Sequence, residues 1–263
     1  MSRFNDHKEA KKQLKDIERY KDRYLIIHYA CESFFSTQGR SPHITAIAIK
    51  DIASNQTKLF AIHQIAETQH IDFHAIQSDY DNLEKEILKE FFAFVKQNIS
   101  KTWIHWNMRD ANYGFSAIEQ RYKVLGGNPE IIRDSDKIDL SNLFIKLYGK
   151  GYIANPRIQS LMDKNKINPK NFLIGMDEAA AFDNKEYVKL SFSAARKVDV
   201  FNDFLTQATD NTLKVNSHYR EIYGDSLWGL YTMLQDTNWG KAVLWILNLI
   251  IGGFIGAWIS HIA

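Results

Sequence analysis

Residues 24–64 contain three runs that decide the fold: YLIIHYA at 24–30, HITAIAIKD at 43–51 and TKLFAIHQ at 57–64. Each run is rich in isoleucine, alanine, leucine or phenylalanine, as buried β-strands are. Turn-forming stretches rich in Gly, Ser, Asn and Pro separate the runs. Three successive strands with short connections predict an antiparallel meander.

Helices and strands alternate in the sequence that follows. Residues 80–98 have one apolar helical face, and residues 112–124 predict a second helix. Between them, residues 102–107 predict a fourth strand, and a short fifth strand is expected at 131–134. Residues 141–214 are mainly helical in pattern. The order β-β-β-α-β-α-β-α predicts an α/β fold in which helices flank a mixed sheet with an antiparallel half and a parallel half.

The overall composition excludes several classes of protein. The chain of 263 residues has a formal net charge of only +2, so it lacks the strong basic field that favours long duplex DNA. A local basic groove remains compatible with this charge. Cys31 is the only cysteine, which excludes an intramolecular disulfide and a four-thiolate zinc site.

Residues 1–23 are highly charged and have no apolar core of the kind found in secretory signals. We therefore expect the bulk of the chain to stay in the cytoplasm. Leu14, Ile17 and Tyr20 are spaced along one weakly apolar stripe, which predicts a helix. A solvated helical arm is one interpretation, and binding to nucleic acid or lipid headgroups is the other.

Residues 241–260 predict a single transmembrane helix. Residues 242–259 carry no charge, and 18 helical residues span about 27 Å, close to one hydrocarbon core. Trp239 and Trp258 lie near the ends, and Lys241 stands at the N-terminal edge. We therefore expect a single-pass protein of the inner (cell) membrane with its large domain, residues 24–214, in the cytoplasm. Residues 215–240 would form a linker or juxtamembrane helix.

The same segment has a stripe of small and polar residues. Asn248, Gly252, Gly256 and Ser260 follow each other at intervals of four, so they share one face of a helix. An asparagine amide in lipid needs a partner, and one helix per chain offers none within the chain. The stripe thus predicts a homo-oligomer. It would be either a passive dimer seam or a pore of four or more copies around a narrow polar path, with a tetramer suspected.

Three segments upstream carry candidate site residues: YACESF at 29–34, HWNMRD at 105–110 and SAARKVD at 193–199. In this order they resemble the three motifs of the DEDD-type 3′→5′ exonucleases, over residues 24–207. The resemblance implies an RNase H-like fold with the first motif on its central strand. It also implies two magnesium ions held by a cluster of carboxylates, because hard cations prefer oxygen ligands.

The carboxylates that match those motifs are Glu32, Asp110 and Asp199, which are therefore the candidate magnesium ligands. The first aspartate of the family is replaced by Ala30, and the histidine of the third motif by Ala194. Alanine can neither bind a metal nor abstract a proton, so the resemblance implies a degenerate domain that is not an enzyme.

A pocket shaped for single-stranded DNA would survive those losses. Arg109, Arg196 and Lys197 are expected to contact phosphates, and Phe34 and Trp106 to stack on bases. The alternatives are core positions for Phe34, a solvated helix face for Arg196 and Lys197, and ordinary surface positions for Glu32 and Asp199. The complete predicted nucleic-acid-binding set is Glu32, Phe34, Trp106, Asn107, Arg109, Asp110, Arg196, Lys197 and Asp199.

A degenerate exonuclease-like domain joined to one membrane helix resembles the membrane effectors of the Hailong anti-phage defence systems. That resemblance implies that a partner nucleotidyltransferase makes single-stranded DNA oligomers. The bound oligomer would hold an oligomeric pore closed, and its loss would open the pore and depolarise the membrane.

Two other functions remain open on the sequence alone. A membrane-tethered nuclease would need its missing aspartate from elsewhere, for example Asp134, Asp136 or Asp139. A tail-anchored adaptor would use the α/β domain to bind protein, and it would need only an inert anchor.

Overall fold

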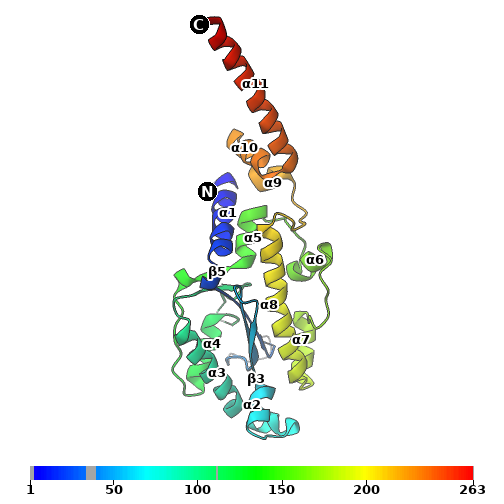
Figure 1. Cartoon of the computed structure of the whole chain (residues 1–263). Helices are drawn as coiled ribbons and strands as arrows, with labels where there is room; N and C mark the ends of the chain where they lie inside the picture. Colours follow the sequence, from blue (N-terminus) through cyan, green and yellow to red (C-terminus); the bar gives the residue numbers. More distant parts are fainter. Residues whose placement is uncertain (1–2, 34–39, 111, 263) are drawn as a thin grey trace. The chain divides into compact units, whose positions relative to one another are not determined.

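The computed structural model of the chain describes residues 3–33, 40–110 and 112–262, with the side chains of all but 238 and 256–262 (Figure 1). The chain divides into two compact units. The sheet unit comprises Gln13–Leu143 and Ala154–Lys214. The terminal unit comprises Met1–Lys12, Phe144–Ile153 and Val215–Ala263. Each unit is described by itself below.

The sheet unit is built on a five-stranded mixed sheet of order β3-β2-β1-β4-β5. β1 pairs antiparallel with β2, which pairs antiparallel with β3, and β1 pairs parallel with β4, which pairs parallel with β5. The predicted α/β fold with its antiparallel and parallel halves is thereby confirmed. The strands are β1 Tyr24–Cys31, β2 Ile44–Asp51, β3 Thr57–Ala61, β4 Thr102–His105 and β5 Lys137–Asp139.

Three predicted strand boundaries were wrong. The third run ends as a strand at Ala61, because Ile62, Ile65 and Ala66 bury one face of a helix that starts there. The fourth strand ends at His105, since Asn107 adopts a left-handed conformation with φ 54°.

The fifth strand is Lys137–Asp139 rather than residues 131–134. Ile138 lies opposite Ile104 in the parallel ladder, whereas Ile131 is half exposed and has no strand partner among the described residues. The apolar residues Ile131 and Ile132 therefore led to a strand being predicted a few residues before β5.

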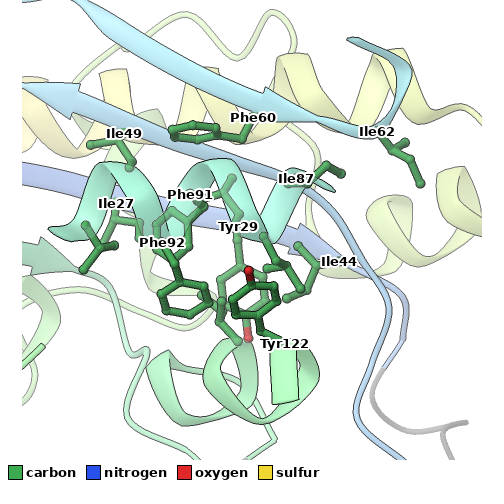
Figure 2. Close-up of a cluster of buried hydrophobic side chains, with 14 of the residues drawn as sticks. Ile27, Tyr29, Ile44, Ile49, Phe60, Ile62, Ile87, Phe91, Phe92 and Tyr122 are labelled. Carbon is green, nitrogen blue, oxygen red and sulfur yellow. The ribbon is translucent and has the colours of Figure 1, made fainter. Parts of the chain in front are cut away.

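Helices cover both faces of the sheet, as Figure 1 shows. Successive side chains of β1 point to opposite faces of the sheet. Those of Leu25, Ile27 and Tyr29 therefore join a core with α3 and α4, part of which is shown in Figure 2. His28, on the opposite face, packs against Phe201 of α8. The helices of this unit are α2 Ile62–Thr68, α3 Tyr80–Gln97, α4 Phe115–Val124, α6 Arg157–Lys164, α7 Gly175–Asp183 and α8 Tyr187–Thr209, with 3-10 turns at Lys21–Arg23, Phe73–Asp79 and Asp134–Asp136.

The N-terminal segment forms the helix α1, Arg3–Arg19, as predicted. Its apolar stripe is not that of a solvated arm, because Leu14 and Ile17 are each only 2% exposed. The interpretation of α1 as a free arm was therefore wrong. α5, Leu140–Tyr148, is the other helix that has residues in both units.

The terminal unit also holds α9 Tyr219–Tyr223, α10 Leu227–Asp236 and α11 Asn238–Ile262. Residues 241–260 are thus helical, as predicted. Within the described residues, no single helix is long and apolar enough to cross a membrane. The bent pair of Leu227–Asp236 and Trp239–Ile255, at 107° to each other, meets that requirement jointly, by length and composition alone.

Candidate functional site

Glu32 directly follows the central strand β1, where the resemblance places the first motif. Its side chain is buried, and Arg40 donates hydrogen bonds to both carboxylate oxygens, with Nη2 2.8 Å from Oε2. The backbone N–H of His43 donates to Oε1 at 2.7 Å. Because a guanidinium already pairs with this carboxylate, a metal ion there would have to displace Arg40.

A second carboxylate lies at the start of α3, also paired with arginine. Ligand atoms of His43, Asp81 and Glu84 lie within 4.8 Å of one another, which resembles a metal site. Arg121, however, donates to both oxygens of Glu84, at 3.0 and 2.6 Å, and to Asp81. Burial tends to lower the pKa of Arg121, but the bonds and charge of Glu84 and Asp81 outweigh it and raise that pKa. The guanidinium occupies the position a cation would take.

The carboxylate of the third motif does not lie beside that of the first. Asp199 of α8 pairs with Lys50 at 3.0 Å, and Lys50 lies opposite Ile26, near the start of β1. Glu32 follows the other end of that strand, so these two predicted metal ligands bind different cations. Arg196 donates to the backbone oxygen of Asn168 at 2.8 Å.

The second motif forms its own cluster where β4 and β5 end. Arg109 Nε lies 2.6 Å from Asp139 Oδ2, and the backbone N–H of Asn107 donates to Asp139 Oδ1 at 3.2 Å. Asp139 also caps α5 by accepting the N–H of Ser141. Asp110 is exposed and accepts the N–H of Asn112 within its own loop. None of the described contacts links Asp110 to Glu32 or Asp199.

The other acids considered as replacements are equally engaged. Asp134 pairs with Lys137 at 2.8 Å, and Asp136 pairs with Arg133 at 2.7 Å. With Asp139 bound to Arg109, all three are held by a basic neighbour. The structure therefore places none of them with Glu32.

Three of the predicted residues, Trp106, Asn107 and Lys197, line one cavity of about 580 Å³ in the sheet unit. Trp106, Phe172 and Phe201 supply aromatic walls. The first residues of α6 and α7 complete the lining, and neither helix has a side-chain hydrogen bond at its N-cap. The charged lining residues are Lys197 and Arg157, and the described lining contains no carboxylate.

Lys197 is the most deeply placed cation of this cavity. It is 5% exposed, pairs with Glu178 Oε2 at 2.6 Å and lies 5.5 Å from the centre of the Phe172 ring. Burial raises the pKa of Cys31, and the charges of Glu178 and Glu32 raise it further, so both carboxylates lie near the end of β1. His28 of β1 also lines the cavity, so the cavity borders the central strand.

His28 contributes a neutral polar group to the same cavity. Burial, and then the charge of Lys197, hold the pKa of His28 well below its usual value. Its Nδ1 is 3.2 Å from the hydroxyl of Tyr113, and its Nε2 has no hydrogen-bond partner among the described residues. A buried nitrogen without a partner costs stability unless a ligand or water bonds it.

Base stacking was expected at Trp106 and Phe34. The Trp106 ring is 6% exposed and stacks on Phe201, with centroids 5.6 Å apart, so it forms a wall rather than an exposed platform. Phe34 lies outside the described residues. The sequence did not predict His28, Arg157 or Phe172. Strand alternation could have found His28, because it places residues 28 and 30 on one face of β1.

No family model matches this chain, and no curated protein matches it. What the protein does must therefore be inferred from its own sheet, cavity and terminal helices.

Proposed function

We propose that the sheet unit is a catalytically degenerate, exonuclease-like domain of RNase H-like fold that binds single-stranded DNA oligomers without cutting them. The mixed sheet supports this, because its antiparallel and parallel halves meet at β1, the strand that bears the first motif. The three motif-bearing segments also follow β1, follow β4 and lie within α8, in the order that the resemblance requires.

One observation carries the proposal: basic side chains pair with the acids Glu32, Glu84 and Glu178, beside a cavity whose described lining has no carboxylate. Glu32, Glu84 and Glu178 are bound by Arg40, Arg121 and Lys197, respectively. Two-metal hydrolysis needs free carboxylates to hold its cations, and each of these three acids is already paired with a cation.

The cavity instead suits one nucleotide of a single strand. Its volume of about 580 Å³ falls in the usual range for small-molecule sites. Arg157 and the uncapped N–H groups at the start of α6 attract a phosphate, and Lys197, which also pairs with Glu178, lies in the same lining. The aromatic walls offer apolar surface to a base, and His28 Nε2 offers a neutral hydrogen-bonding group.

α11 would place this domain at the inner membrane as a single-pass protein. Its part with described side chains, which ends at Ile255, does not meet the requirement for a span alone, but the uncharged run of the sequence continues to residue 259. The 25 residues of α11 extend about 37 Å, and its described apolar side chains, such as Trp245, Ile251 and Phe254, are exposed. Soluble proteins rarely expose so much contiguous apolar surface unless it meets lipid or a partner. The membrane effector would be a homo-oligomer, with a tetramer favoured, packed along Asn248 and Gly252. Gly256 and Ser260 continue this stripe beyond the described side chains.

In this proposal the DNA oligomer, made by a partner nucleotidyltransferase, binds the closed state more tightly than the open one. It therefore holds the pore closed by its differential affinity. When a phage removes the oligomer, the pore opens and depolarises the membrane. This is an anti-phage defence function that needs no catalysis and no magnesium in the sheet unit.

The test is binding and cleavage by the full chain in detergent. End-labelled single-stranded DNA is added with magnesium or manganese, and both anisotropy and strand length are followed. We expect binding with no shortening. Lys197→Gln, which removes the cation, and Gly175→Trp, whose added atoms start in open space at the cavity, should each weaken binding at least about tenfold.

Arg133→Gln is the matched control, because Arg133 is exposed in the same unit and does not line the cavity. Its affinity should equal that of the unaltered chain. Shortening of the strand that depends on magnesium would instead establish the membrane-tethered exonuclease. Absence of binding to any single-stranded DNA would leave the proposal without support.

A further inference from the structure

One face of α10, Leu227–Asp236, packs against the rest of the terminal unit. Gly229 is buried against the backbone of Tyr223, with no room for a side chain. Seven residues later on the same face, Asp236 pairs with Lys11 at 2.9 Å and accepts from His7 at 3.3 Å. Burial tends to raise the pKa of Asp236, but the bonds from His7 and Lys11 lower it to about 2, so this end stays ionised.

The opposite face of α10 is apolar and open. Leu227 is 85% exposed and Trp228 69%, and Leu230 and Tyr231 are also about half exposed. No charged residue occurs in the helix apart from Asp236 on the fixed face. A helix with one packed face should bury its other apolar residues too, unless something outside the chain covers them.

The bend into α11 indicates what covers that face. α10 and α11 lie at 107°, close to a right angle, with only Thr237 between them. In Figure 1, α10 lies at the end of α11 away from the C-terminus. The bend is tightly packed, because a Cβ at Gly240 would collide with the backbone of Leu234. Trp239, directly after the bend, is half exposed, as are many apolar residues of α11.

We propose that the Leu227–Trp228–Tyr231 face of α10 lies in the headgroup region of the same lipid bilayer that α11 enters. This rests on the proposed membrane function of α11. A helix nearly perpendicular to a membrane span lies nearly in the membrane plane, and tryptophan and tyrosine are the residues enriched at that depth. Lipid explains both exposed surfaces of this unit at once, because they adjoin on one bent pair of helices.

The test uses the full chain in vesicles of phosphatidylcholine and phosphatidylglycerol. Cys31→Ala removes the native thiol, and one cysteine is introduced at residue 227, 231, 250 or 9 and labelled with an environment-sensitive fluorophore. Leu227, Tyr231 and Ile250 are exposed, so labels there displace little packing. Glu9, in α1 of the same unit, is the control for an exposed position away from the face. Bromine is placed at shallow or deep positions of the lipid chains.

We expect labels at 227 and 231 to be quenched more by shallow than by deep bromine, the label at 250 to show the reverse order, and the label at 9 to be unquenched. Quenching at 250 with none at 227 and 231 would overturn the interfacial helix while leaving the membrane span intact. Absence of quenching at all four positions would overturn the proposed membrane function itself.

Discussion

The charge of Glu84 is balanced by the guanidinium of Arg121. Its side chain is fully buried, and Arg121, itself only 6% exposed, pairs with it at two positions. Arg121→Ala would leave a buried carboxylate without its cation, which typically costs about 3–5 kcal/mol. We expect the free energy of unfolding, measured by urea titration of the full chain in detergent, to fall by that amount.

Arg133→Ala is the control for that experiment. Its guanidinium is 74% exposed and pairs with Asp136 three residues away, so its removal should cost at most about 0.5 kcal/mol. Equal losses for the two variants would show that the Arg121 network does not stabilise the sheet unit.

His105 predicts a specific dependence of stability on pH. Burial lowers its pKa from 6.5 to about 4, and the charges of Asp139, Arg109 and Lys137 have smaller effects. The unfolded chain therefore binds a proton at a higher pH than the folded chain does. Stability should fall as the pH drops from about 6.5 to about 4, by about 3 kcal/mol for His105 alone. The buried His28 acts in the same direction.

Urea unfolding of the full chain at pH 7 and pH 5 measures this effect. His105→Asn retains an acceptor for the N–H of Met108 and removes the titrating group. The difference in stability between the two pH values should shrink in this variant. An unchanged difference would mean that other groups cause it.

At the scale of single residues, the sequence grouped three residues that share one cavity, but it did not predict the partners of the acids. The motif positions Trp106, Asn107 and Lys197 do line one cavity. Arg40 and Arg121, which neutralise Glu32 and Glu84, come from a loop and from α4, and no spacing rule links a residue to a partner 8 or 37 positions away. Charge pairing of this kind arises from tertiary packing, so local patterns could not predict it.

At the scale of elements, long periodic segments were predictable and short ones were not. β1 and α3 were found because six or more of their residues are buried in a regular pattern. β5 has only three residues, and its identity depends on pairing with β4, which the sequence does not display. The start of α2 and the three 3-10 turns among the described residues were missed too, because segments this short carry little periodicity.

The stripe on α11 predicts a difference between two adjacent glycines. A Cβ at Gly252 or Gly253 meets no other described atom of the same chain within 4 Å, so neither substitution by leucine should strain one copy. Gly252 lies on the stripe with Asn248, and Gly253 lies about 100° around the helix. Gly252→Leu should abolish oligomers detected by cross-linking in membranes, because its side chain would separate the packed helices.

Gly253→Leu carries the same change in volume and should leave the cross-linked oligomers intact. If both variants or neither lost the oligomers, the Asn248–Gly252 face would not be the contact between copies.

At the scale of the whole molecule, the proposal couples the cavity of the sheet unit to the membrane helix. In cells that make the DNA oligomer, Lys197→Gln should depolarise the membrane without any phage, because the ligand no longer favours the closed state. A voltage-sensitive dye measures this. Adding Gly252→Leu should restore polarisation by preventing pore assembly, whereas adding Gly253→Leu should not. If depolarisation persists in the Lys197→Gln, Gly252→Leu double variant, the depolarisation does not arise from a pore assembled through α11.

The arginine and lysine partners of Glu32, Glu84 and Glu178 also determine how long a signal would last. An active nuclease destroys its own ligand, so the lifetime of its bound state is limited by its turnover rate. A receptor whose acids are already neutralised has no such limit. Under the proposed function, its resting state would persist until something foreign removed the DNA, and the protein would time the invader's activity rather than its own.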